Sequence, residues 1–203
     1  ERFLSFENGL VKTSPIKGTR PRKEDPFEDQ KQVMELSCSE KDRAENIMIV
    51  DLLRNDLGKT CIPGSIKVEK FLEVETYRTI HHLVSTVTGN LRNDKSILDL
   101  LYGCFPGGSI TGAPKRRSME IIDELELDAR SAYCGSVMYI SAHGRMDSNI
   151  AIRTLQCSSG EVSCWGGGGI VADSTWQREY QETFDKVAPF LKTLDRSFES
   201  QGS

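Results

Sequence analysis

Segments typical of strands and segments typical of helices occur in separate blocks along the chain, and this order most constrains the fold. Loose alternation of apolar residues over Glu1–Lys12 predicts a strand with a turn at Asn8-Gly9. Two segments between Ile66 and Leu91 predict two more strands, because β-branched residues alternate there. Three further strands are expected over residues 136–142, 149–157 and 162–165. Segregated strands and helices favour an α+β architecture over a doubly wound one.

Helices are expected between these blocks of strands. Ser39 offers an N-cap, and Glu40–Leu57 is rich in helix-forming residues until Gly58. Shorter helices are expected over residues 27–36, over residues 97–104 and after Pro114. Apolar residues at helical spacing predict a final helix: Tyr180, Phe184, Val187, Leu191 and Leu194. Pro189 is expected to kink that helix or end its first half, and the proline-containing segment 13–26 predicts a loop.

Composition excludes several classes of partner. The 26 basic and 30 acidic residues give a net charge of -4, so no positive field would attract nucleic acid or an anionic membrane. No apolar stretch approaches the length of a membrane span, and the first residues do not resemble a signal peptide. The six cysteines form no CxxC pair. We therefore expect a cytoplasmic protein with reduced cysteines and no nucleic-acid or membrane partner.

Lys17 is the first candidate for chemistry. It lies in a loop-like segment between Pro15 and Gly18. A lysine acts as a nucleophile only when burial or neighbouring cations leave its amine uncharged. A solvated loop lysine is the alternative, and the motif alone does not decide between them.

Three carboxylates on expected helices are candidates for a metal site: Glu45, Glu179 and Glu182. Mg²⁺ prefers oxygen ligands and usually takes only one or two protein carboxylates, with water and substrate oxygens completing its shell. Solvated acidic helix faces would give the same spacing. The sequence alone leaves both interpretations open.

Two glycine-rich segments could bind an anion through backbone N–H groups, Gly107–Gly112 before a helix and Gly166–Gly169 after a strand. Gly112 is followed by alanine and proline, so the first segment does not match a P-loop. Close packing or a flexible bend is the alternative for the second. Arg153 lies in an apparently apolar strand, where its guanidinium would need a ligand carboxylate or an internal salt bridge.

Eight motifs in order resemble the chorismate-utilising enzyme family: PIKGTRPR, EKDRAENIMIVDLLRNDLG, HHLVSTVTG, FPGGSITGAPK, YCGSVMYIS, IRT, GGGGIVADS and EYQETFDK. The resemblance implies two antiparallel β-sheets packed face to face with helices outside, as in anthranilate synthase. Family members resemble chains roughly twice this long. Residues 1–195 would then be the C-terminal portion of a chorismate-binding domain whose N-terminal half is missing, and residues 196–203 a disordered tail.

Lysine at position 17 resembles the branch of the family that makes 4-amino-4-deoxychorismate, a precursor of p-aminobenzoate and folate. In that branch the lysine is proposed to add to chorismate and then to be displaced by ammonia, which a glutamine amidotransferase subunit supplies. An anthranilate synthase large component, or a catalytically incomplete piece that only docks a subunit, is the alternative.

The resemblance also implies roles for the other candidates. Glu45 and Glu182 would bind Mg²⁺, with Glu179 acting through water or a ligand, and Glu1 would be a general acid whose pKa burial must raise. His82, which should face the opposite side of its strand from His81, would orient or shuttle a proton. The remaining residues would hold the substrate carboxylates or lie beside the ring: Ser109, Tyr133, Arg153, Gly167, Gly168 and Gly169.

Overall fold

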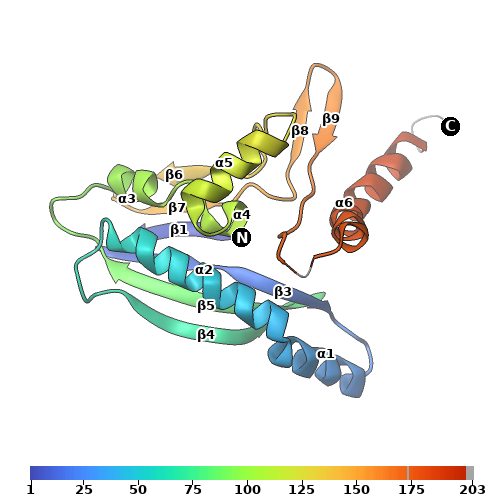
Figure 1. The fold of residues 1–203 in the computed structure, drawn as a ribbon, viewed down its shortest axis with the longest axis horizontal. Helices are drawn as coiled ribbons and strands as arrows, with labels where there is room; N and C mark the ends of the chain where they lie inside the picture. The colour runs from blue at the N-terminus through green and yellow to red at the C-terminus, as the bar shows by residue number, and fades with distance from the viewer. Residues whose placement is uncertain (173, 200–203) are drawn as a thin grey trace. The chain divides into compact units, whose positions relative to one another are not determined.

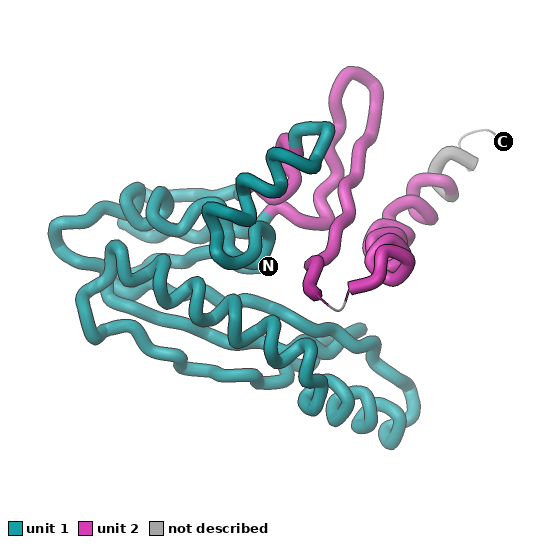
Figure 2. Tube along the Cα trace, viewed as in Figure 1, with its two compact units in different colours: residues 1–129, 136–150 teal, residues 130–135, 151–203 magenta. Residues whose placement is uncertain are grey.

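The computed structural model describes residues 1–172 and 174–199 and divides the chain into two units. Unit 1 comprises residues 1–129 and 136–150, and unit 2 comprises residues 130–135 and the chain from residue 151 onward (Figure 2). Each unit has its own β-sheet, and every described strand pair is antiparallel. The predicted α+β class with antiparallel sheets is therefore confirmed.

A seven-stranded sheet forms the frame of unit 1 (Figure 1). Its order is β3-β5-β2-β1-β7-β6, and β4 pairs with β5 as well. The strands are β1 (Arg2–Glu7), β2 (Leu10–Ser14), β3 (Ile16–Pro21), β4 (Lys67–Thr76), β5 (Ile80–Asn90), β6 (Met138–Ile140) and β7 (Met146–Asn149). The turn between β1 and β2 is at Asn8-Gly9 as predicted, and both residues have positive φ.

The segment expected as a loop contains strand β3, so that prediction was wrong for residues 16–21. β2 and β3 follow one another along β5, which pairs with β2 near its end and with β3 near its beginning. The register of β3 shifts between Ile16 and Thr19. Lys17 therefore lies at an irregularity in a strand rather than in a free loop.

Five helices belong to unit 1: α1 (Pro26–Cys38), α2 (Glu40–Gly58), α3 (Ile97–Cys104), α4 (Gly108–Thr111) and α5 (Lys115–Leu125). The side chain of Ser39 caps α2 as predicted, by accepting from the N–H of Asp42. The long helix α2 packs on β3 and β5 and buries Ile49, Leu53 and Leu57. Burying each such side chain contributes about 1.5–3 kcal/mol, so α2 is firmly held on the sheet.

Unit 2 contains a hairpin and a long helix. The strands β8 (Leu155–Ser158) and β9 (Glu161–Cys164) are joined by the predicted turn at Ser159-Gly160. The helix α6 (Trp176–Glu199) continues through Pro189 instead of ending there. It also passes residue 196, where the disordered tail was expected to begin, and residues 200–203 lie outside the described residues.

The strand expected over residues 149–157 does not exist as one element. The chain leaves the sheet of unit 1 after Asn149 and forms a strand again only at Leu155. Ile150 and Ala151 are buried, which produced the apolar pattern, but Arg153 between the two strands has a φ of 50°. None of the described helices is both long enough and apolar enough to cross a membrane.

Candidate functional site

Glu1, Lys17 and Ser109 meet in unit 1, although they come from three separate parts of the chain. Nζ of Lys17 donates to the carbonyl oxygen of Ser109 at 3.3 Å. The carboxyl group of Glu1 accepts hydrogen bonds from the Ser109 side chain and from the N–H of Ile16. The positive charge of Lys17 also acts on this carboxyl group. The carbonyl of Glu1 is held by the N–H of Ile150 at 3.0 Å, so β1 begins in a fixed position.

The environment of Glu1 favours its protonated form. Loss of solvent on burial raises the pKa of this carboxyl group, and that effect outweighs the opposing hydrogen bond from Ser109 and the charge of Lys17. A carboxylic acid that keeps its proton toward neutral pH can act as a general acid.

Gly18 allows β3 to approach the helices closely. Its φ is +88°, and a Cβ at this position would lie 2.8 Å from Cδ1 of Leu36 and 2.9 Å from Cγ of Asp42. Any larger residue would push β3 away from α1 and α2 or force the backbone out of the left-handed region. The glycine after Lys17 therefore fixes where the lysine lies.

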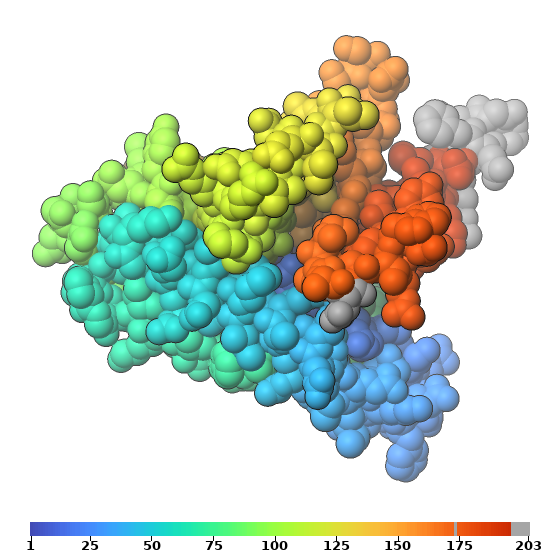
Figure 3. Space-filling view, in the orientation of Figure 1, coloured from blue at the N-terminus to red at the C-terminus, as the bar shows by residue number. Residues whose placement is uncertain are grey.

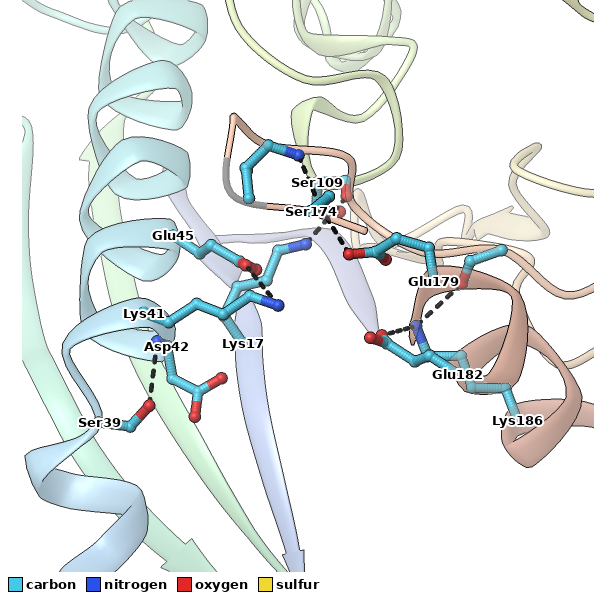
Figure 4. A network of polar contacts seen from close by, with 12 residues as sticks. Lys17, Ser39, Lys41, Asp42, Glu45, Ser109, Ser174, Glu179, Glu182 and Lys186 are labelled. Carbon is cyan, nitrogen blue, oxygen red and sulfur yellow. Dashed lines mark hydrogen bonds and ion pairs between the residues drawn. The ribbon is translucent and has the colours of Figure 1, made fainter. Parts of the chain in front are cut away.

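Helix α2 presents Glu45 from the same unit. The side chain of Glu45 is 20% exposed, and its nearest cation is Lys41 Nζ at 3.9 Å. The neighbouring Asn46 is fully buried and ties α2 to β5, since it donates to the carbonyl of Leu83 and accepts from Ser85. Asn46 therefore holds this part of α2 on the sheet, and the distant Lys41 only weakly neutralises the charge of Glu45 (Figure 4).

Unit 2 carries a second acidic pair, Glu179 and Glu182, one helical turn apart on α6. Glu179 Oε1 accepts from Ser174 Oγ at 2.6 Å, while its buried Oε2 accepts no hydrogen bond from any described residue. Glu182 Oε1 accepts from Lys186 Nζ at 2.6 Å (Figure 4). A Cβ at Gly168 would lie 2.9 Å from Glu179 Oε2, so both carboxylates border this glycine.

These carboxylates fit a divalent cation. A buried carboxylate oxygen without a donor carries a desolvation cost that a cation would relieve. The described residues contain no group of three or more His, Cys, Asp or Glu side chains that could hold a metal unaided. Mg²⁺ does not require one, because water and substrate oxygens usually fill most of its positions.

The glycine run lies against Tyr133 within unit 2. A Cβ at Gly167 would lie 2.5 Å from the Tyr133 hydroxyl oxygen. Lys186 Nζ donates to the carbonyl of Gly167 at 2.9 Å, which fixes the run next to α6. No described residue accepts a hydrogen bond from the N–H groups of Gly168 and Gly169, and both glycines are exposed. Binding of an anion by these amides stays a prediction.

Arg153 corrects the sequence prediction. Its side chain is exposed and lies outside any strand, so it does not point into a core and needs no internal anion. Exposure leaves the guanidinium able to pair with an external carboxylate. The expected role of Arg153 as a ligand for substrate therefore stays a prediction, whereas the structural argument for it was wrong.

The two adjacent histidines face opposite sides of β5, as predicted. Nδ1 of His81 lies 2.9 Å from Thr76 Oγ1, and its Nε2 lies 3.0 Å from Asp29 Oδ1. Both ring nitrogens therefore have hydrogen-bond partners within the protein. His82 Nδ1 lies 2.8 Å from Thr19 Oγ1, and its ring packs edge-on against Tyr77. The side chain of His82 thus contacts the strand that carries Lys17, and its role in proton transfer stays a prediction.

Sequence reasoning missed Lys186 and Ser174. Lys186 is one turn beyond Glu182 on α6. Glutamate and lysine four residues apart on a helix often form an ion pair, so this contact could have been predicted from the sequence. The contact of Ser174 with Glu179 depends on a loop conformation that no periodicity reveals.

Several known proteins are similar to this chain in sequence. Residues 1–192 match the family model described as chorismate binding enzyme. The chain is 55% identical over 195 residues to aminodeoxychorismate synthase component 1 of Salmonella typhimurium, covering 96% of this chain and 43% of that protein. It is 44% identical over 201 residues to anthranilate synthase component 1 of Aquifex aeolicus, covering 99% of this chain and 41% of that protein.

A solved structure has the same fold. The crystal structure of anthranilate synthase component I from Streptococcus pneumoniae matches with a TM-score of 0.82 and 41% identity, over 92% of this chain and 41% of that one. The chain therefore spans less than half the length of each of these three proteins.

Proposed function

Because this chain belongs to the chorismate-binding enzyme family, we propose that it is the C-terminal catalytic portion of an aminodeoxychorismate synthase component 1. One observation supports this assignment over other activities of the family. A lysine, Lys17, lies beside a buried carboxylic acid, Glu1, at a position where nucleophile and acid would act on one ring. The relative from Salmonella typhimurium carries the corresponding name.

In the proposed reaction Lys17 is the nucleophile. Its amine adds at C2 of chorismate and loses a proton, both ring double bonds shift, and the C4 hydroxyl departs as water. Ammonia then adds at C4 and loses a proton, both double bonds shift back, and the lysine takes up a proton and leaves as the free amine. The substitution is thereby divided into two steps that each have a lower barrier. The carbonyl of Ser109 directs the lysine nitrogen in the free enzyme.

Glu1 supplies the proton with which the C4 hydroxyl leaves as water. Burial raises the pKa of Glu1, so the acid is protonated at a pH where an exposed glutamate would be ionised. The hydrogen bond from Ser109 and the contact with Ile16 N–H orient the carboxyl group. His82, on the strand next to Lys17, would relay protons at the C4 side of the ring.

Glu45 and Glu182 would hold Mg²⁺, with Glu179 contacting the ion through water or through one of its ligands. When bound, the ion supplies a positive charge that neutralises the ring carboxylate and orients it. The N–H groups of Gly167, Gly168 and Gly169 would bind the ring carboxylate, and Tyr133 and Arg153 the enolpyruvyl carboxylate. A separate glutamine amidotransferase subunit would deliver ammonia.

Product analysis tests this assignment. The chain is incubated with chorismate, an ammonium salt and Mg²⁺, and the products are separated and identified by mass and fluorescence. Formation of 4-amino-4-deoxychorismate is expected. Anthranilate as the main product would overturn the assignment and favour the activity named for the Aquifex aeolicus relative.

A non-catalytic docking module is distinguished by binding. Calorimetric titration with chorismate, with and without Mg²⁺, is expected to give Mg²⁺-dependent binding. Absence of any such binding would contradict the proposal that this portion binds chorismate by itself and would favour a docking module or a catalytically incomplete piece.

A further inference from the structure

Asp56, near the end of α2, is a fully buried carboxylate that the proposed chemistry does not use. Only 1% of its side chain is exposed, yet it contacts two cations. Its Oδ2 accepts from Lys115 Nζ at 2.6 Å, and its Oδ1 accepts from Lys59 Nζ at 2.8 Å. A charge at this depth persists only because both oxygens are paired.

The two lysines connect Asp56 to both ends of the glycine-rich segment, which we define as residues 105–114. Lys115 directly follows the segment and also donates to the carbonyl of Cys104, which directly precedes it, at 2.8 Å. Lys59 donates to the carbonyl of Gly103 at 3.0 Å. One carboxylate on α2 therefore closes the glycine-rich segment into a loop.

The middle of the glycine-rich segment packs directly on α2. Gly108 packs so closely on Leu52 of α2 that an added Cβ would collide with the leucine side chain. Leu52 is one turn before Asp56, so both contacts come from one face of α2. Figure 3 shows α2 and the segment that leads into α5 packed side by side in unit 1.

Glu45 lies on the same face of α2, because Glu45, Ile49, Leu52 and Asp56 follow at steps of four, three and four residues. One rigid helix thus carries a candidate metal ligand at one end and the anchor of the glycine-rich segment at the other. Ser109, in that segment, contacts both Lys17 and Glu1. The position of the acid and the nucleophile relative to α2 depends on this anchor.

We propose that Asp56 is a positioning residue, which fixes the glycine-rich segment on α2 so that Ser109 holds Glu1 and Lys17 in their reactive arrangement. The effect on turnover rests on the proposed function. The effect on the segment itself does not, and it can be measured without substrate.

Three variants separate positioning from simple stability: Asp56→Asn, Lys115→Met and the double variant Asp56→Asn with Lys115→Met. Each single change leaves a buried charge without one of its partners and lowers stability. The double change removes both charges of the closest pair, so it is expected to recover part of the lost stability but not the anchor. Asp51→Asn is the control, because Asp51 is on α2, is largely exposed and forms an ion pair with Arg54 at the protein surface.

Hydrogen exchange of the native chain without substrate is the first measurement. Faster exchange confined to the glycine-rich segment is expected in all three Asp56 and Lys115 variants, and none in Asp51→Asn. Unchanged exchange in the segment of the double variant would overturn the proposal. This result stands whether or not the chain turns over chorismate.

Turnover and its pH profile are the second measurement. A shift of about 1 Å at reacting groups can cost about a hundredfold in rate, so kcat is expected to fall ten- to a hundredfold in the double variant. The alkaline limb of the profile is expected to move to higher pH, because Glu1 loses the hydrogen bond from Ser109. A double variant with wild-type kcat and pH profile would contradict positioning. A wild-type chain without turnover would instead count against the proposed function.

Discussion

Nζ of Lys17 lies 3.3 Å from the carbonyl oxygen of Ser109, which joins the irregular strand β3 to the short helix α4. The hydroxyl of the same serine bonds to Glu1. A single residue thus contacts both the candidate nucleophile and the candidate acid, and substitution of its side chain should disturb the acid directly.

Replacing Ser109 with alanine is expected to move the alkaline limb of the pH–kcat profile to higher pH. The hydroxyl stabilises the ionised form of Glu1 and so lowers its pKa, and its removal lets burial raise the pKa further. An acid catalyst is active while protonated, so the active range extends upward. Initial rates across the pH range give this profile. An alkaline limb that moves to lower pH in the alanine variant would contradict the role of the Ser109 hydroxyl.

Replacing Gly18 with alanine is expected to destabilise the protein more than replacing Gly9. Both glycines have φ near +85°, at +88° and +83°, but a Cβ at Gly9 would meet nothing within 4 Å. The left-handed conformation alone costs about 1–2 kcal/mol, and overpacking against Leu36 and Asp42 adds about 1–3 kcal/mol at Gly18. Urea unfolding of the two variants measures this difference, and equal losses would show that the close approach at Gly18 is not needed.

Glu182→Gln is expected to raise the Mg²⁺ concentration for half-maximal activity by about tenfold or more, because substitution near a metal typically costs ten- to a hundredfold in affinity. Chelation of Mg²⁺ should abolish activity in the parent chain. Glu120→Gln is the matched control, since Glu120 is a half-exposed glutamate on α5 that pairs with Arg116 and Arg117. An unchanged Mg²⁺ titration for Glu182→Gln would remove this residue from the metal site.

Sequence periodicity predicted the elements whose burial pattern is local. Helix α2 was expected over residues 40–57 and extends over residues 40–58. The residues that determine its two ends, the N-cap Ser39 and Gly58, lie at the ends of the segment itself and can be read from the sequence. The predicted hairpin of β1 and β2 and the pair β4 and β5 are present for the same reason. The family motifs also selected Lys17, Glu1 and Ser109, which the structure brings together.

Strand β3 could not be predicted because its partner is distant in sequence. Pro15 precedes it and Pro21 ends it, and proline is normally a sign of a loop. Its pairing with the beginning of β5 decides its conformation. The split of the expected strand 149–157 likewise depends on where the chain leaves the sheet of unit 1, and buried Ile150 and Ala151 resemble strand residues in sequence alone.

Asp29→Asn is expected to lower stability at neutral pH and to have a smaller effect in acid. The N–H of Lys23, the guanidinium of Arg22 and His81 hold the pKa of Asp29 well below its usual range. A depressed pKa stabilises the fold above the unfolded value of about 3.9, and this contribution is lost as the pH falls below it. Denaturant unfolding at pH 7 and at about pH 3 measures the change.

Asp51→Asn is the control for these unfolding measurements, because Asp51 is mostly exposed and forms an ion pair with Arg54 at the protein surface. Its stability difference from the parent should be small, because exposed ion pairs contribute little. If Asp29→Asn and Asp51→Asn behaved alike at both pH values, the network around Asp29 would not contribute to the link between α1, β3 and β5.

The most direct test of the account is a search for a covalent adduct on Lys17. The chain is incubated with chorismate and Mg²⁺ in the absence of ammonia, digested, and mapped by mass spectrometry. The account predicts one modified peptide, carrying chorismate less one water on Lys17, which is absent from Lys17→Ala and disappears when ammonium is added. Binding of chorismate without any such adduct, or an adduct that persists in Lys17→Ala, would contradict it.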